Sequence, residues 1–421
     1  MSHSGLRKLQ RLFSKKIKTF SFGALPFSKR KKLWYNEFMI NLSDYGIDMW
    51  DSDKIADFRR TLLAWYDREK RDLPWRRTSD PYKIWISEIM LQQTQVVTVI
   101  PYYKHFLDWF PTVEKLANAP EEKLLKAWEG LGYYSRVRNM QAAAQQIMTN
   151  FGGRFPDKYE DISKLKGIGP YTAGAIASIA FGLPEPAVDG NVMRVMARLF
   201  EIKQDVGDPK NRKIFQAIME KLIDPARPGD FNQALMDLGT DIESAKNPRP
   251  DESPIRAFSA AYLHGTYHLY PIKAPKKKPR PLQIQAFIIQ NQAGEFLLEK
   301  NVEGRLLGGF WSFPIIETNL IAQQLNLFEK ETDVLETISQ IKLFEDDYQL
   351  SPTWSDKTFA PVKHTFSHQK WTIELLEGFV EKAELTSPKE LRWVSPANFD
   401  AYPMAAPQKK MVAEVLKPKK K

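Results

Sequence analysis

The sequence predicts two domains of different class, a mainly helical domain over residues 53–270 and a separate α+β domain over residues 282–416. Apolar residues recur at helical spacing through the first region, and alternation typical of strands begins only in the second. Between them, residues 271–281 are rich in Pro and Lys, which favours a stiff, extended linker. A chain of 421 residues is long enough to give each domain a core.

The composition excludes several kinds of site. The chain contains no Cys, so disulfides and cysteine-ligated zinc or iron–sulfur centres have no ligands. A membrane-spanning helix needs about 18 consecutive apolar residues, and no apolar run in the sequence approaches this length, so we expect no membrane span. The net charge is +10, and basic residues gather near both ends of the chain. Such clusters favour nucleic acid as a partner, although solubilising tails would explain them equally well.

The two ends of the chain are predicted to be basic segments outside the two domains. Residues 1–52 form a basic extension, expected to be disordered, and residues 417–421 form a basic tail. For the extension we favour a DNA-binding arm, or an over-long start with Met49 as the first residue, over an organelle-targeting signal. If the source is bacterial, we expect a cytoplasmic, nucleoid-associated protein.

The segment Lys83–Ile100 is predicted to form one helix around which the helical domain is organised. Its unusual residue is Glu88, a single carboxylate in an apolar run. In an apolar site a carboxyl group keeps its proton to higher pH, and such a group can serve as a general acid. The alternative is an amphipathic helix whose Glu88 points to water, and the helix taken alone favours that alternative.

Two further motifs lie between predicted helices. The run Leu165–Thr172, L-K-G-I-G-P-Y-T, predicts a helix-hairpin-helix near residues 161–180. Gly167 and Gly169 would let the backbone turn sharply and present amide groups to a DNA phosphate. Asp189 directly precedes another helix, where an ordinary N-cap is the commoner explanation. A carboxylate placed beyond such a hairpin could instead face a sugar ring.

These segments together resemble adenine DNA glycosylases of the MutY type, in the helix-hairpin-helix base-excision superfamily. The resemblance rests on Trp75-Arg76, Trp85–Val96, Gly130–Asn139, the hairpin and Val188–Val195. It is closest over residues 53–245. It implies two helical lobes with a cleft, followed by a Nudix-like domain. It also implies double-stranded DNA with adenine opposite 8-oxoguanine or guanine as substrate, bound by a monomer.

The resemblance also implies roles for individual residues. Glu88 matches the general acid that protonates adenine, and Asp189 the carboxylate that stabilises the oxocarbenium-like sugar. Asn191 matches the residue that positions this carboxylate, and Tyr171 one that assists at the active site. Two carboxyl groups with separated pKa values suit glycosidic cleavage. The residues implied to contact DNA or the displaced base are Arg76, Leu91, Gln92, Gln93, Thr94, Tyr133, Gly167 and Gly169.

Bifunctional relatives, which also cut the DNA backbone, carry a Schiff-base lysine where this chain has Tyr171. We therefore expect a monofunctional glycosylase with little or no lyase activity. In the second domain, Phe366, Ser367 and His368 resemble the loop with which the family recognises 8-oxoguanine. The cluster of glutamates typical of Nudix hydrolases is absent, so this domain is expected to recognise its target and not to hydrolyse it.

Most relatives hold an iron–sulfur cluster on four cysteines just before the linker. In the corresponding loop, 243–259, the four ligand positions are occupied by Glu243, Pro250, Ser253 and Ser259. We therefore expect no cluster, no metal and no other cofactor. Alternatives remain open: another glycosylase of the superfamily, an abasic-site lyase, or a catalytically silent DNA-binding protein. The sequence indicates no particular repair-protein partner.

Overall fold

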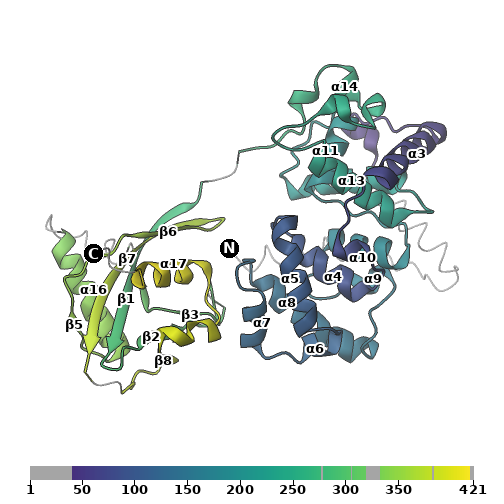
Figure 1. Cartoon of the computed structure of the whole chain (residues 1–421). Coiled ribbons are helices and arrows are strands. Elements are labelled where there is room, and N and C mark those ends of the chain that lie inside the picture. The colour runs from purple at the N-terminus through teal and green to yellow at the C-terminus, as the bar shows by residue number, and fades with distance from the viewer. Residues whose placement is uncertain (1–39, 276–277, 305, 319–331, 382–383, 418–421) are drawn as a thin grey trace, which may run out of the picture.

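The fold is described from a computed structural model, which places residues 40–275, 278–304, 306–318, 332–381 and 384–417 (Figure 1). The predicted disorder of residues 1–39 and the basic tail from residue 418 lie outside the described residues. Two helical lobes and a sheet domain make up the described chain. None of the described helices is long and apolar enough to cross a membrane.

The first helical lobe has its own apolar core, built from residues between Leu73 and Ala177 together with Phe310 and Ala405 of the sheet domain. Trp85, Phe106 and Trp128 are completely buried in it. Its helices are α4 (Pro81–Leu91), α5 (Val96–Trp109), α6 (Val113–Ala117), α7 (Glu121–Ala127), α8 (Ser135–Phe151), α9 (Tyr159–Ile162) and α10 (Pro170–Phe181).

The second lobe combines the beginning of the domain with its end. Figure 1 shows α3 beside α11 and α13, although the first lobe lies between them in the sequence. A second apolar core runs from Leu42 to Ile255 and joins these segments. The helices of this lobe are α3 (Ser52–Glu69), α11 (Gly190–Leu199), α12 (Arg212–Leu222), α13 (Pro228–Asp241) and α14 (Ala260–Leu263).

The predicted beginning of the helical domain at residue 53 is too late. A short 3-10 helix, η1 (Leu42–Tyr45), precedes α3, and Leu42 and Ile47 are buried in the second core. The Trp50 ring lies 4.7 Å from that of Phe200. Residues 40–52 therefore belong to the packed domain, because their apolar side chains cover α3 and α11. The abundance of basic residues just upstream had obscured this boundary.

The prediction of a single helix over Lys83–Ile100 is also wrong. The chain forms α4 and α5, with a break at residues 92–95. Gln93 adopts a φ of +60°, which a right-handed helix does not permit. Helix α5 continues through Pro101, at the cost of one backbone hydrogen bond. Residues 92–95 contain neither Gly nor Pro, so the sequence showed no helix breaker at this point.

The predicted hairpin is present as α9, a turn and α10. Gly167 adopts a φ of +77°, and a Cβ there would lie 2.6 Å from Cβ of Asn139. Gly169 has an extended backbone with φ of −89° and caps α10, which begins at Pro170. Only Gly167 is thus required to be glycine by its backbone and surroundings, since Gly169 has space for a side chain.

The sheet domain contains a mixed eight-stranded sheet in the described part of the chain. Its centre is the parallel pair β1 and β7, with Arg280 opposite Gln369 and Asn291 opposite Val380. Helix α17 (Ala406–Val415) packs on one face through Met411, and α16 (Thr332–Tyr348) covers the other through Phe344. The strands are β1 (Arg280–Asn291), β2 (Phe296–Lys300), β3 (Trp311–Ser312), β4 (Ile315–Glu317), β5 (Thr353–Trp354), β6 (Val362–Thr365), β7 (Gln369–Val380) and β8 (Leu391–Val394).

Sequence patterns indicated the strands β1, β2, β7 and β8 and the helix α16. The strands β3, β4, β5 and β6 were not indicated, because they are too brief to show a period. Strand β1 begins at Arg280, inside the predicted linker. The beginning of that linker is attached to the second lobe, because the Val206 amide donates to the Ile272 carbonyl at 3.0 Å. The extended segment between the domains is consequently shorter than predicted.

Candidate active site

A cavity of about 850 Å³ lies between the two helical lobes. Helices α4 and α10 of the first lobe line it, together with α11 and α13 of the second. Helix α10 packs against both α4 and α13, which holds the two walls together. The predicted site residues that line this cavity are Arg76, Glu88, Leu91, Gln92, Gln93, Thr94, Gly169, Tyr171, Asp189 and Asn191.

Glu88 faces this cavity and not the solvent. Its side chain is 6% exposed, and the Tyr171 hydroxyl donates to a Glu88 carboxyl oxygen at 2.6 Å. The pKa of Glu88 is raised from 4.5 to about 7, mainly by burial and to a smaller extent by the negative charge of Asp189. The hydrogen bond from Tyr171 and the charge of Arg76 oppose this rise. The interpretation of Glu88 as a water-facing residue is therefore wrong.

Asp189 is both an N-cap and a cavity residue. One of its oxygens accepts from the Val192 amide at 2.7 Å at the beginning of α11. The other accepts from Nδ2 of Asn191 at 2.9 Å. Burial raises the pKa of Asp189, while these hydrogen bonds and the charge of Arg194 lower it. The capping bonds thus fix the direction in which this carboxylate faces the cavity.

Arg194 fixes the orientation of Asn191. Its Nη2 donates to Oδ1 of Asn191 at 2.7 Å, and its Nε donates to the Glu243 carbonyl at 2.7 Å. Because the amide oxygen accepts from arginine, the amide nitrogen is directed at Asp189. A continuous series of hydrogen bonds therefore joins Asp189 to the loop 243–259. The sequence analysis had given Arg194 no role.

Arg76 lies at the cavity wall, but its guanidinium group is bound to Asp237. The Arg76 Nη1–Asp237 Oδ2 distance is 2.5 Å, and the Arg76 Nη2–Asp237 Oδ1 distance is 2.8 Å. Arg71 also donates to this carboxylate, which is 1% exposed. The ion pair joins the first lobe to α13, and the contact of Arg76 with DNA or the displaced base stays a prediction.

Two loops beside the cavity carry Gln93 and Tyr133, which the resemblance implies fill the space left by the displaced base as a wedge. The loop of residues 130–134 around Tyr133 is named the wedge loop. Gln93 and Tyr133 both have positive φ, and Tyr133 is 52% exposed. Tyr133 lies outside the cavity lining, as does Gly167 of the hairpin. Arg136 joins the loops, because its Nη1 donates to the Gln92 carbonyl at 2.5 Å and its Nη2 to the Leu131 carbonyl at 2.8 Å.

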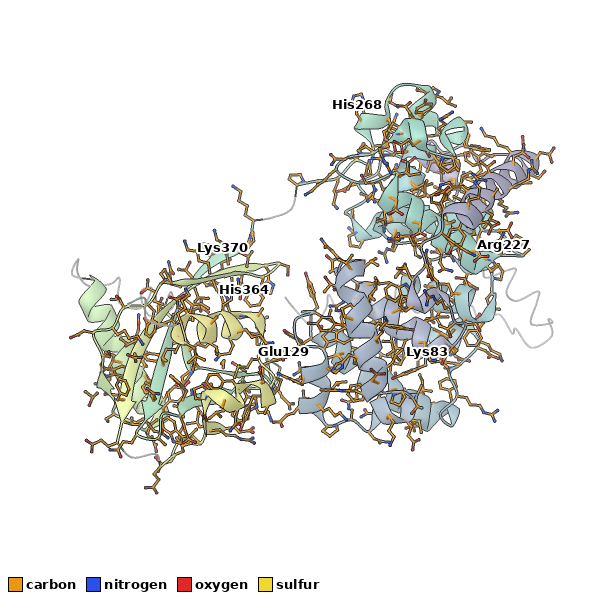
Figure 2. All side chains as sticks on the ribbon, viewed as in Figure 1. Lys83, Glu129, Arg227, His268, His364 and Lys370 are labelled. Atoms are coloured by element: carbon orange, nitrogen blue, oxygen red, sulfur yellow. The ribbon has the colours of Figure 1, made fainter. Side chains whose placement is uncertain are left out.

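The residues predicted to recognise 8-oxoguanine do not line the cavity. Phe366, Ser367 and His368 form the turn between β6 and β7, near the labelled His364 and Lys370 in Figure 2. The Phe366 ring packs 4.9 Å from that of Trp371, and Ser367 Oγ lies 3.3 Å from Nδ1 of His368. The ring of Phe366 therefore also supports the sheet domain.

The loop at the predicted cluster position is held by a buried ion pair. Glu243, 2% exposed, binds Arg198 with an Nη1–Oε2 distance of 2.9 Å and accepts from the Tyr267 hydroxyl. The Arg198 guanidinium also lies 4.2 Å from the centre of the Tyr267 ring. Ser259 Oγ donates to the Arg198 carbonyl at 3.1 Å.

These residues do not fit a metal cluster. Pro250 has no side-chain donor, and the hydroxyl of Ser253 is buried without a partner. The Glu243 carboxylate is already neutralised by Arg198, and the protein has no thiolate. Within the described ranges, no group of three or more His, Cys, Asp or Glu is arranged to hold a metal ion.

Several further residues line the cavity without a role predicted from the sequence, among them Trp75, Gln233 and Met236. Trp75 follows the break that ends α3, and its ring packs 5.4 Å from that of Tyr103. Gln233 and Met236 are one turn apart on α13, so both can face the same side of the helix. This spacing indicates that the two residues share one helix face, but α13 contains no sequence motif that would mark that face as part of a site.

The folds and the cavity define a helix-hairpin-helix protein with a Nudix-like second domain. Residues 86–225 match the family model of the HhH-GPD superfamily base excision DNA repair proteins, and residues 285–414 match that of the NUDIX domain. A solved thermostable thymine-DNA glycosylase is 28% identical, with a TM-score of 0.46, and covers 50% of this chain and 98% of its own.

Curated relatives define the family more narrowly. The adenine DNA glycosylase of Homo sapiens is 33% identical over 419 residues, covering 86% of this chain and 74% of the relative. That of Buchnera aphidicola subsp. Baizongia pistaciae is 36% identical over 306 residues, covering 70% of this chain and 85% of the relative. The chain belongs to the adenine DNA glycosylase family. The predicted family and fold class are thereby confirmed.

Replacement of Glu88 by Gln is expected to change how stability depends on pH. A carboxyl group whose pKa is raised on folding destabilises the folded chain as pH rises from about 4.5 to about 7, by about 3 kcal/mol in all. The Glu88→Gln variant lacks this loss. In urea unfolding, the free energy of unfolding of the variant should therefore rise relative to that of wild type between about pH 4 and about pH 8. A difference that stays constant with pH would contradict the burial of Glu88.

Replacement of Glu243 by Ala is expected to destabilise the second lobe by about 3–5 kcal/mol, because it leaves the buried Arg198 charge unpaired. Glu252 in the same loop provides a matched control. Its ion pair with Arg249 is largely exposed, so Glu252→Ala should cost less than about 1 kcal/mol. Urea denaturation monitored by circular dichroism measures both. Equal losses would show that the buried pair does not hold the loop.

Proposed function

We propose that this protein is a DNA glycosylase that removes adenine paired with 8-oxoguanine or guanine. The observation that carries the proposal is the meeting of Glu88 and Asp189 in one cavity from opposite lobes. A pKa of about 7 keeps a large fraction of Glu88 protonated near neutral pH. Membership of the adenine DNA glycosylase family supplies the substrate class.

Glu88 is the general acid. Its proton passes to a nitrogen on the imidazole side of adenine while the N-glycosidic bond breaks, and the electrons of that bond leave with the base. Proton transfer from a positioned group contributes about 10²–10⁴-fold to such a reaction. The hydroxyl of Tyr171, 2.6 Å from the carboxyl, holds Glu88 in place for this transfer.

Asp189 is the carboxylate that stabilises the positive charge developing on the sugar. Asn191, oriented by Arg194, keeps the Asp189 oxygen in position. Water then adds to the sugar carbon that has lost the base. The proton released by this water returns to Glu88, so the products are free adenine and an abasic site with the acid restored.

The adenine must leave the duplex to enter the cavity, at a cost of a few kcal/mol. Gln93, with Leu91 and Tyr133, fills the space that the base vacates. The amides around Gly167 and Gly169 bind a backbone phosphate without reading sequence. Phe366, Ser367 and His368 contact the 8-oxoguanine that stays opposite the vacated position.

The proposed enzyme lacks lyase activity and an iron–sulfur cluster. Tyr171 stands where bifunctional relatives carry a lysine, so the enzyme is monofunctional. The ion pair between Arg198 and Glu243 holds the loop 243–259, so the enzyme works without an iron–sulfur cluster. We further expect a monomer without other cofactors, acting on nucleoid DNA if the source is bacterial.

Excision is tested with an end-labelled duplex containing adenine opposite 8-oxoguanine, followed by heating in alkali. The wild type should produce a break at the adenine, and Glu88→Gln should lower the single-turnover rate by about 10²–10⁴-fold, because the proton donor is lost. Glu252→Gln, on the exposed ion pair, is the control and should retain the wild-type rate. No break with wild type, or an unchanged rate with Glu88→Gln, would refute the proposal.

Lyase activity is tested on the same duplex without alkali and with borohydride. A monofunctional enzyme should leave the strand intact until alkali is added and should form no covalent complex with DNA. Trapping requires an amine nucleophile, which Tyr171 does not supply. A trapped complex at a level comparable with base release would contradict monofunctional action.

A further inference from the structure

The sheet domain contributes an aromatic residue to the core of the first helical lobe. Phe310, in the loop before β3, is completely buried and packs in the cluster that contains Trp128 and Val137. Its ring centre lies 4.1 Å from that of Tyr134. Tyr134 directly follows the exposed wedge residue Tyr133 and caps the beginning of α8. Phe310 therefore lies behind the wedge loop.

The contacts around Phe310 are close enough to fix its position. Gly309 has a φ of +78°, and a Cβ there would lie 2.7 Å from Nη2 of Arg138 and 3.0 Å from Cδ1 of Leu125. Arg138 donates to the Gly308 carbonyl and also binds Glu121 with an Nε–Oε1 distance of 2.7 Å. A side chain at residue 309 would be strained by the positive φ and would displace Arg138 from its position between the two domains.

A second contact lies at Glu129, at the boundary between the two domains in Figure 2. This carboxylate is 7% exposed and accepts from the Met404 amide at 3.2 Å. It also pairs with Lys409 of the sheet domain at 2.9 Å and with Lys126 of its own lobe at 2.8 Å. Glu129 directly precedes the glycine at which the wedge loop begins, so the loop is held at both of its ends.

The front of the same loop is held by Arg136. Its guanidinium group donates to the carbonyls of Leu131 and Gly132 at 2.8 and 3.0 Å, and also to carbonyls at the end of α4. The loop is therefore fixed between Arg136 on one side and Phe310 on the other. Left-handed backbone at Tyr133 persists only where the surroundings enforce it.

We propose that Phe310 is a positioning residue for base extrusion, which holds Tyr133 in its wedge conformation from the sheet domain. This inference rests on the proposed function, because Tyr133 acts only if a base leaves the duplex. The same domain that carries the 8-oxoguanine loop then also sets the geometry of the wedge. Loss of the Phe310 ring should weaken extrusion while leaving Glu88 and Asp189 in place.

The test measures extrusion separately from chemistry. The Glu88→Gln protein is mixed with a duplex that carries 2-aminopurine in place of the target adenine, whose fluorescence rises when the base unstacks. Adding Phe310→Ala should lower the extrusion equilibrium about tenfold, a typical coupling between contacting residues. Adding Phe379→Ala instead, an exposed phenylalanine on β7, should change nothing. Equal fluorescence for the Phe310→Ala and Phe379→Ala proteins would overturn the proposal.

Two further measurements separate positioning from general destabilisation. In a protein that also carries Tyr133→Ser, Phe310→Ala should have no additional effect on the fluorescence, and an undiminished effect would overturn the proposal. If Phe310→Ala prevents folding, as judged by circular dichroism, Phe310→Leu keeps the apolar contact without the ring and should lower extrusion to a smaller extent. Wild-type protein that releases no adenine would refute the proposed function, whereas normal release with unchanged extrusion in both Phe310 variants would refute only this inference.

Discussion

Two carboxyl groups from different helical lobes face one cavity, and the proposed reaction requires one of them to be protonated while the other is ionised. Glu88 comes from α4 of the first lobe, and Asp189 from the beginning of α11 in the second. Burial raises the pKa of both groups, and the charge of Asp189 makes Glu88 harder to ionise. The position of one lobe relative to the other therefore controls the chemistry, and several contacts serve to fix it.

The most direct of these contacts is the group formed by Arg71, Arg76 and Asp237, which joins the segment before α4 to α13. Helix α10 adds a second, because it packs on α4 and on α13 at once. Helix α11 connects the cavity to the loop 243–259. It presents Asp189 and Asn191 at its beginning, Arg194 one turn later and Arg198 after a further turn, where Arg198 binds Glu243. The active site and the loop without cysteines are thereby part of one hydrogen-bonded structure.

The sequence predicted the residues of the site better than the boundaries of the helices and domains. Glu88, Tyr171, Asp189 and Asn191 were predicted together, and the structure brings all four to one cavity. Whether Glu88 is buried could not be read from its own helix, because the groups that shield it come from α10 and α13, far away in the sequence. The ion pair of Arg76 could not be predicted for the same reason, since Asp237 lies in a segment without a recognisable motif.

The errors in the fold have similar physical causes. The break at Gln93 lies in a segment without Gly or Pro, so no helix breaker in the sequence indicated that one helix ends and another begins. Residues 40–52 were assigned to a disordered extension because two packing partners of Trp50, Phe200 and Phe258, are far away in the sequence. No local sequence pattern indicated the position of Phe310, because this residue of the sheet domain packs in the core of a helical lobe.

The protonation of Glu88 at neutral pH is the central claim, and infrared difference spectroscopy tests it most directly. The carbonyl band of the protonated carboxyl group is followed against pH in wild type, with the Glu88→Gln protein subtracted to isolate this one residue. The structure predicts that the band disappears with a midpoint of about 7. A midpoint near 4.5, the ordinary value for Glu, would contradict the account.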